Sequence, residues 1–237
     1  MSATDNILAA DNAAATGIGK RQVWLIVATL AAGLFVDVHT DLLGQVAVSA
    51  GVWALLLYLL SRVDRKQRYA LMVCLTIATL GEMFCSLVWG LYTYRLHNIP
   101  MFVPPGHVLL LLLGLSASRR MPDSGALAIL GGAAIYSLAA VATGVDTLAA
   151  PLFVVFAVAS LTMPGHRRLF ASTFVLALAL ELYGTWLGNW TWSPVVPGTR
   201  LMTTNPPGVS GAFYCALDAM VAATALLLVP RWSRSAV

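Results

Sequence analysis

Long apolar runs separated by short charged segments form the main pattern of this chain. Eight such runs predict eight helices, each near the roughly 20 residues that a bilayer core of about 30 Å requires. The runs cover residues 23–36, 42–61, 69–94, 100–117, 125–143, 147–163, 169–190 and 208–230. Residues 1–20 are mostly small or polar and predict a disordered tail. We therefore predict an all-α fold, a polytopic membrane bundle of about eight transmembrane helices.

Composition supports a membrane protein over a soluble one. Hydrophobic residues make up 59% of the 237 residues and charged residues only 10%, against about 25% in an ordinary soluble domain. The net charge of +4 arises from cations at helix ends, so it does not indicate nucleic acid as a partner. The three cysteines lie inside apolar runs without a Cys-x-x-Cys spacing, which predicts neither disulfides nor a thiolate metal site.

The basic residues predict how the bundle is oriented, because Lys and Arg concentrate on the cytoplasmic side of a membrane. With the N-terminus inside, only Arg95 and Arg200 of the 14 basic residues fall outside. The inner twelve are Lys20, Arg21, Arg62, Arg65, Lys66, Arg68, Arg119, Arg120, Arg167, Arg168, Arg231 and Arg234. This asymmetry predicts a multi-pass protein of a bacterial-type inner membrane with both termini in the cytoplasm.

A pattern in the third run is repeated in the seventh. Glu82 precedes Gly90 and an aromatic pair, Glu181 precedes Gly188 and another aromatic pair, and a Pro-Pro-Gly follows each. The glutamates are 99 residues apart, the glycines 98 and the Pro-Pro-Gly motifs 102. Unless the match is a coincidence, it predicts two parallel four-helix halves, residues 21–120 and 121–232, related by an axis along the membrane normal.

Three acidic residues are predicted to lie deep in the bilayer. Inserting an acidic residue at the centre of a transmembrane helix costs about 2.5–3.5 kcal/mol, so such residues usually face a cavity or a partner. Helix rise places Glu82, Glu181 and Asp218 in one layer, where desolvation and like charge disfavour several anions. They are candidate catalytic acids and bases. The alternative is a structural role, with each acid hydrogen-bonded to Ser86, Thr185 or a backbone carbonyl.

Aromatic residues accompany the acids at helical spacing. We expect the deeper ones to line a substrate site in which their rings stabilise a cation. The more peripheral residues Tyr94, Trp190 and Trp192 are predicted to belong to an interfacial aromatic belt instead. The predicted substrate-binding aromatics are Trp89, Tyr92, Tyr183 and Trp186.

His107 is the one histidine predicted within the bilayer, and its chemistry suits a proton carrier, although a structural hydrogen bond is the alternative. An outward-facing metal site with His39 and His97 is only weakly indicated, and we predict neither a metal nor a cofactor. The last helix contains no Lys, which excludes a retinal Schiff base there. Motifs for nucleotide hydrolysis, zinc proteolysis and serine hydrolysis are absent from the sequence.

The two patches resemble the integral-membrane carotenoid-biosynthesis family, whose characterised members hydrate terminal double bonds of acyclic carotenoids. The first patch contains Glu82, Gly90, Tyr92, Tyr94, Ile99-Pro100 and Val103-Pro104. The second contains Glu181, Gly188, Trp190, Trp192 and the segment from Asn205 to Gly208. The resemblance covers about a quarter of the chain. It implies an enzyme acting on a long isoprenoid, with Glu82 and Glu181 as catalytic candidates and Asn205 in the site.

Together these patterns predict an intramembrane acid–base enzyme. A neutral carboxylic acid would protonate a carbon–carbon double bond of an isoprenoid or carotenoid, and a second carboxylate would complete hydration, isomerisation or cyclisation. Which carboxyl is the acid stays open. The alternative is a proton-coupled transporter or flippase, in which the same acids carry protons. In either case the predicted partners are a lipophilic small molecule and the membrane lipids.

Overall fold

The computed structural model describes residues 18–232, with side chains described to residue 224, and consists of eight α-helices and two short strands. The helices are α1 (Lys20–Val38), α2 (Leu42–Leu60), α3 (Arg65–Glu82), α4 (Val103–Ser118), α5 (Asp123–Thr143), α6 (Ala149–Thr162), α7 (Arg167–Leu187) and α8 (Gly211–Trp232). The prediction of an all-helical bundle is confirmed. The predicted disordered tail lies, up to residue 17, outside the described residues.

In the described part of the chain, five helical segments are long and apolar enough to cross a membrane, which is compatible with a membrane protein. They are α1, α2, α5, α3 with its extension to Val88, and α7 with the turn that precedes it. Helix α4 is shorter, and every residue from Val108 to Leu115 is buried. A helix that is apolar on all sides belongs in the interior, surrounded by other helices.

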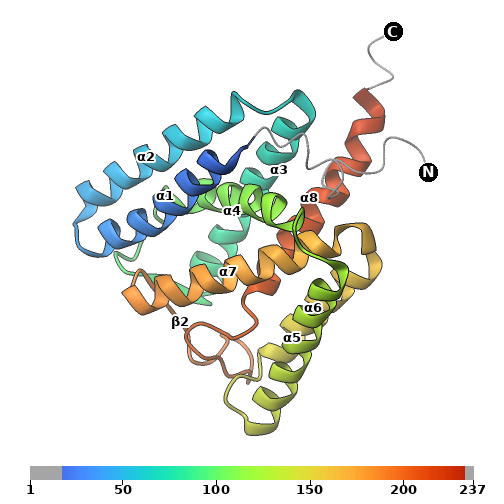
Figure 1. Cartoon of the computed structure of the whole chain (residues 1–237). Coiled ribbons are helices and arrows are strands. Elements are labelled where there is room, and N and C mark those ends of the chain that lie inside the picture. The colour runs from blue at the N-terminus through green and yellow to red at the C-terminus, as the bar shows by residue number, and fades with distance from the viewer. Residues whose placement is uncertain (1–17, 233–237) are drawn as a thin grey trace.

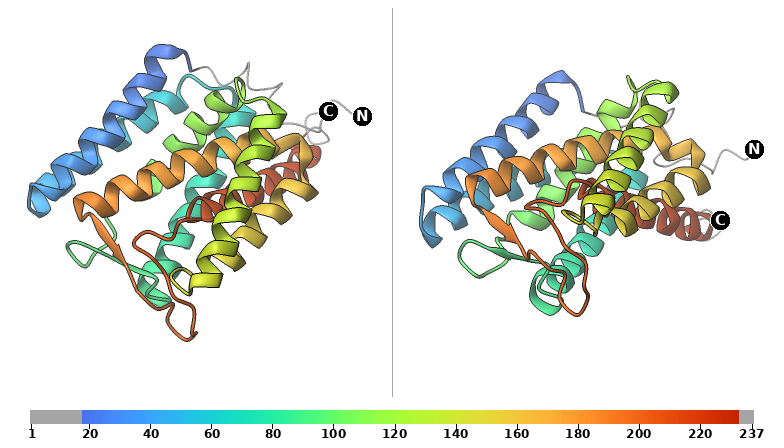
Figure 2. Two further views of the ribbon diagram at one scale, coloured as in Figure 1. Left: turned by 60° about the horizontal axis from the view of Figure 1, so that its bottom comes forward. Right: turned by 90° about the horizontal axis from the view of Figure 1, so that it is seen from below.

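Helix α4 lies at the centre because its neighbours cover it. It packs against α3 and α7, and also against α1 and α2. The α1–α2 hairpin and the α5–α6 hairpin lie on opposite sides of α7 (Figure 1). Two further views show α7 crossing the molecule between the two hairpins (Figure 2). The central group is therefore α3, α4, α7 and α8, with α3 also packed on α8 and α7 on α8.

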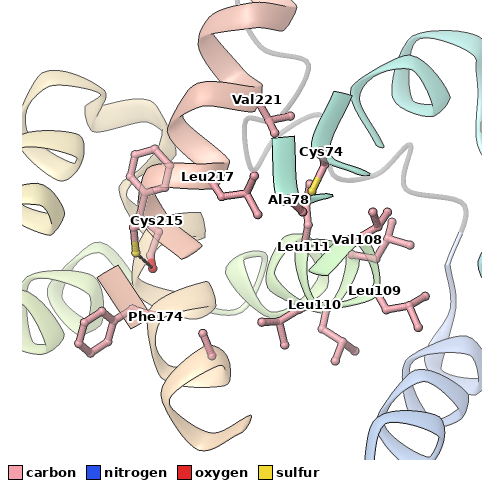
Figure 3. Packing of buried hydrophobic residues seen from close by; sticks show 14 of the residues in the cluster. Cys74, Ala78, Val108, Leu109, Leu110, Leu111, Phe174, Cys215, Leu217 and Val221 are labelled. Carbon is pink, nitrogen blue, oxygen red and sulfur yellow. Dashed lines mark hydrogen bonds between the residues drawn. The ribbon is translucent and has the colours of Figure 1, made fainter. Parts of the chain in front are cut away.

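The interior of this central group consists of small and branched apolar side chains. Figure 3 shows Cys74 and Ala78 of α3 next to Val108 and Leu111 of α4, with Leu217 of α8 beside them. All five side chains are buried. Cysteines 74 and 215 are buried free thiols, as expected for packing residues. This close packing fixes the positions of the ends of α3 and α7, which carry the two glutamates.

The third and seventh apolar runs do not stay α-helical to their predicted ends, and this part of the prediction is wrong. Helix α3 widens into a π-helix at Met83–Val88, and the chain reverses at Gly90, whose φ is +73°. Helix α7 ends before Gly188, with φ +88°. Glycine tolerates these left-handed conformations and so allows a strand to follow each helix. The strands are β1 (Tyr92–Tyr94) and β2 (Trp190–Trp192).

We predict that Gly211→Ala destabilises the bundle, because α7 and α8 touch at this point. A Cβ at Gly211 would lie only 2.3 Å from the carbonyl oxygen of Phe174. Backbone cannot move aside as a side-chain tip can, so we expect a loss of about 1–3 kcal/mol in the free energy of unfolding. Thermal unfolding in detergent measures it. In the control Gly131→Ala the Cβ meets nothing within 4 Å, and equal unfolding temperatures for both variants would contradict the prediction.

Candidate active site

Glu82 is the last residue of α3 and is held by the two tyrosines of β1. Its Oε2 accepts hydrogen bonds from the hydroxyls of Tyr92, at 2.9 Å, and of Tyr94, at 2.6 Å. Residues i and i+2 of a strand point to the same side, so one strand supplies both donors. Burial, and then the negative charge of Glu82, raise the pKa of Tyr92 and of Tyr94. Both hydroxyls therefore stay protonated and available as donors.

Glu181 of α7 has an equivalent arrangement made with tryptophans. Its Oε2 accepts hydrogen bonds from Nε1 of Trp190, at 2.8 Å, and of Trp192, at 3.1 Å. An indole N–H only donates, so this oxygen acts as the acceptor of two hydrogen bonds and carries no proton. A proton on Glu181 would have to reside on Oε1, which accepts a long hydrogen bond from the hydroxyl of Tyr214, at 3.4 Å.

The two strands pair with each other and bring the two acids together. They are antiparallel, with Tyr92 opposite Trp192 and Tyr94 opposite Trp190. The opposed rings contact each other, with centroids 4.8 Å apart in the first pair and 6.1 Å in the second. All four aromatic side chains thus lie on one face of the ribbon, where they hold the two glutamates as hydrogen-bond acceptors.

His107 and Tyr214 lie between the two glutamates. Their rings are stacked, with centroids 4.8 Å apart and an interplanar angle of 8°. The Nε2 of His107 lies 3.3 Å from Oε1 of Glu82, while Nδ1 lies 3.0 Å from the carbonyl oxygen of Val103. A carbonyl only accepts, so Nδ1 carries a proton. Two unprotonated lone pairs would repel at 3.3 Å, so one further proton belongs to the Glu82–His107 pair.

Two pockets flank these residues, which we call the two-glutamate site: Glu82, Tyr92, Tyr94, His107, Glu181, Trp190, Trp192 and Tyr214. The narrow pocket, of about 580 Å³ with its open side included, lies among α1, α2, α4 and α7. The wide pocket, of about 1060 Å³ with its open side included, lies between α3 and α8. Both pockets share Glu82, Tyr92, His107, Glu181 and Tyr214 as wall residues. The remaining walls are mainly apolar.

Three of the predicted aromatics lie away from the glutamates. Nε1 of Trp89 donates a hydrogen bond to the carbonyl oxygen of Pro197, at 3.1 Å. The hydroxyl of Tyr183 donates a hydrogen bond to the carbonyl oxygen of Ala31, at 3.2 Å. Trp186 stacks near Tyr183 and is 78% exposed. None of the three lines either pocket. Of the predicted substrate-binding aromatics, only Tyr92 reaches the two-glutamate site.

Asp218 and Asn205 are also outside the two pockets. Asp218 is buried on α8, four residues or about 6 Å beyond Tyr214. The structure therefore brings together two of the three predicted deep acids. The exposed Asn205 accepts a hydrogen bond from the backbone N–H of Trp192 at its Oδ1, at 2.9 Å. It holds β2 in place and does not face a pocket.

The prediction that Tyr94, Trp190 and Trp192 form an interfacial belt is wrong. All three are buried and donate to the glutamates. The signal was present in the sequence, because Gly90 and Gly188 are each followed by two aromatic residues that are two positions apart, a strand spacing. The expected structural partner Thr185 donates to the main-chain carbonyls of Glu181 and Leu182, at 2.7 and 3.3 Å, and not to the carboxyl group of Glu181.

Two further buried acids fix the loops around the site, and the sequence analysis missed both. Asp37, at the end of α1, accepts hydrogen bonds from Gln45 and Asn189, at 2.9 and 2.8 Å. Asp146, between α5 and α6, accepts one from the backbone N–H of Gly208, at 2.8 Å. Each acid connects a helical hairpin to a segment next to the two-glutamate site, so it orients the site without lining it.

Within residues 18–224, no three His, Cys, Asp or Glu side chains lie close enough together to hold a metal ion. The weakly indicated outer metal site is therefore not assembled. His39 is in contact with the carbonyl of Phe35 through Nδ1, at 2.7 Å, and His107 faces Glu82 instead.

The arrangement can hold a proton and an anion a short distance apart in an apolar surrounding. Glu82 with His107 holds the proton, and Glu181 is stabilised as a carboxylate by two indole donors. In an apolar pocket such charges act strongly on a bound molecule, because little water screens them. No protein-family model, curated protein or solved structure matches this chain.

Proposed function

We propose that this protein is an intramembrane acid–base enzyme that acts on a carbon–carbon double bond of a lipophilic isoprenoid or carotenoid. One observation carries the proposal: two buried glutamates with different hydrogen-bond partners face the same two apolar pockets. Paired acids in different environments are the usual arrangement for an acid and a base in one site. The resemblance to the carotenoid-biosynthesis family points in the same direction.

Glu82 is the proton donor in this proposal. The Glu82–His107 pair holds a proton between Oε1 and Nε2, and this contact faces both pockets. The proton moves to one alkene carbon, whose new C–H bond uses the π electrons of the double bond and leaves a carbocation on the other carbon. Between cycles Glu181 releases its proton to water, and Nε2 of His107 takes up a proton from water and passes it to Oε1 of Glu82.

Glu181 is the base. Its Oε1 accepts a proton either from a water molecule that attacks the carbocation, which gives hydration, or from a neighbouring C–H bond, which gives isomerisation or cyclisation. The electron-rich ring faces of Tyr92, Trp192 and Tyr214 stabilise the cation while it exists. All three side chains line the wide pocket. Tyr92 keeps the role predicted for it from the sequence, whereas Trp192 and Tyr214 take the place of the other predicted aromatics.

We further propose that the eight helices span the membrane as two parallel repeats, with both termini in the cytoplasm. The strand pairing supports the repeat, because its register is symmetric about Thr93 and Thr191. Each acid also receives two donors from the strand that follows its helix. A pseudo-twofold axis through the ribbon would relate Glu82 to Glu181 and α4 to α8. The distribution of basic residues supports the orientation.

The test is mass spectrometry of lipid extracts from cells that express the protein and are supplied with acyclic carotenoids or shorter isoprenoids. We expect a product heavier by one water, or an isomer, with the wild type and none with the double variant Glu82→Gln/Glu181→Gln. An active double variant would refute the proposal. Unchanged extracts together with substrate-dependent proton movement in liposomes would favour the alternative, a proton-coupled transporter or flippase.

A further inference from the structure

The wide pocket opens at the surface of the bundle between α3 and α8. Its rim includes Leu80 and Gly81 of α3 and Met220 of α8. Leu80 is 61% exposed and Met220 48%, and both are apolar. Large exposed apolar side chains on a helical bundle are suited to hydrocarbon and poorly suited to water. The opening therefore faces the side of the bundle that the lipid chains would cover.

Gly81 keeps this opening clear. A Cβ placed there would meet nothing within 4 Å, although the residue lies in α3 directly before Glu82. Glycine costs about 0.5–1 kcal/mol relative to alanine inside a helix, so its presence is not explained by helix stability. Nor is it explained by close helix packing, as at Gly211, because no neighbour approaches it.

The walls identify the kind of molecule that fits. The five shared residues supply two carboxyls, an imidazole and two phenol groups, while Ala78, Leu217 and Met220 are among the apolar wall residues. Among the described residues that line the two pockets there is no Lys or Arg. A phosphate or diphosphate head group would meet two acids and no cation, which excludes it electrostatically.

We infer that an uncharged hydrocarbon chain enters the site sideways from the bilayer, between α3 and α8 and over Gly81. The inference rests on the proposed function for the identity of the chain as a substrate. The chain occupies the wide pocket, next to Ala78 and Leu217, which lie side by side in Figure 3. Its double bond then reaches Glu82 and Glu181, and no polar group of the molecule has to cross the protein surface.

The experiment uses photolabelling, which needs no turnover. The full-length protein in liposomes is irradiated with a long-chain alkene that carries a diazirine, and labelled residues are identified by mass spectrometry. In the wild type we expect labels on Phe213 and Leu217 inside the pocket, and on Leu138 of α5, which is 74% exposed and serves as the internal standard. The same chain ending in a phosphate should label Leu138 and spare the pocket.

Gly81→Trp should lower the pocket labels about tenfold relative to Leu138, equivalent to about 1.4 kcal/mol of lost binding. The matched control Gly131→Trp places the same side chain where a Cβ also meets nothing within 4 Å, and should leave the ratio unchanged. Gly81→Leu is a smaller block in case the tryptophan prevents folding. Unchanged pocket labels in a folded Gly81 variant, or equal labelling by the phosphate probe, would overturn the inference.

The two proposals fail in different ways. Pocket labels that disappear in Gly81→Trp support the sideways entrance even where no alkene is converted, and in that case only the proposed enzymatic function fails. Conversion of an alkene without any effect of Gly81→Trp on the labels overturns the entrance and leaves the enzymatic function intact.

Discussion

Glu82→Gln is expected to lower kcat by about 10²–10⁴-fold, the usual contribution of a general acid. Glutamine has nearly the same shape, and its carbonyl oxygen can still accept the hydrogen bonds from Tyr92 and Tyr94. Its NH₂ group can donate to Nε2 of His107 but cannot release a proton to carbon. The variant should therefore fold and bind substrate normally. Steady-state turnover of the purified protein, with its thermal unfolding as a check, measures both effects.

The control for this variant is Asp123→Asn, the same chemical change at the first residue of α5. Asp123 is 75% exposed and lies 3.5 Å from Arg168, a surface contact that contributes about 0–1 kcal/mol. The Asp123→Asn variant should leave kcat unchanged. A folded Glu82→Gln variant that retains most of the wild-type kcat would remove Glu82 from the role of proton donor.

The second large effect is expected for the double variant Trp190→Phe/Trp192→Phe. It removes both N–H donors to Glu181 and keeps the aromatic rings. Two hydrogen bonds to a charged group contribute about 1.5–3 kcal/mol each, so a buried carboxylate without them becomes much less stable. If Glu181 acts as a carboxylate, kcat falls by about 10²–10⁴-fold. When the fall in kcat is expressed as an increase in activation free energy, each single variant should show about half of the increase seen in the double variant.

Trp53→Phe separates this effect from a general loss of stability. Nε1 of Trp53 donates to the carbonyl of Met101, at 2.9 Å, and Trp53 lines neither pocket. Its replacement should change the unfolding temperature slightly and leave kcat as it was. Equal kcat values for the wild type and the double tryptophan variant would show that Glu181 does not act as the carboxylate.

The sequence was sufficient to predict the helices and the two glutamates, because both follow from local patterns. Apolar runs predict helices directly, and acids inside such runs are conspicuous. The spacing that relates Glu82 to Glu181 also predicted that they would share a site. His107 could be proposed for the same reason, as a single polar residue in an apolar stretch.

The wrong predictions for the aromatic residues of the strands arose because the depth of each residue in the membrane was measured along an ideal, straight helix. The chain reverses at Gly90 and Gly188, so the residues that follow turn back toward the glutamates instead of continuing to the membrane surface. A straight helix extended past these glycines places Tyr94 and Trp190 at the interface, whereas the structure folds both back onto the glutamates. Trp186 lies before Gly188 on α7 and misses the site for another reason, because its side chain is on the exposed side of that helix. Asp37 was missed because its partner Asn189 is 152 residues away in the sequence.

The most direct test of proton transfer from a carboxylic acid to carbon is turnover in D₂O. The wild type should place one deuterium on the carbon that is protonated, and mass spectrometry of the product locates it. The Glu82→Gln variant should incorporate none during the same time. A product that carries no carbon-bound deuterium, formed by the wild type in D₂O, would contradict the central claim that the Glu82–His107 proton is delivered to the double bond.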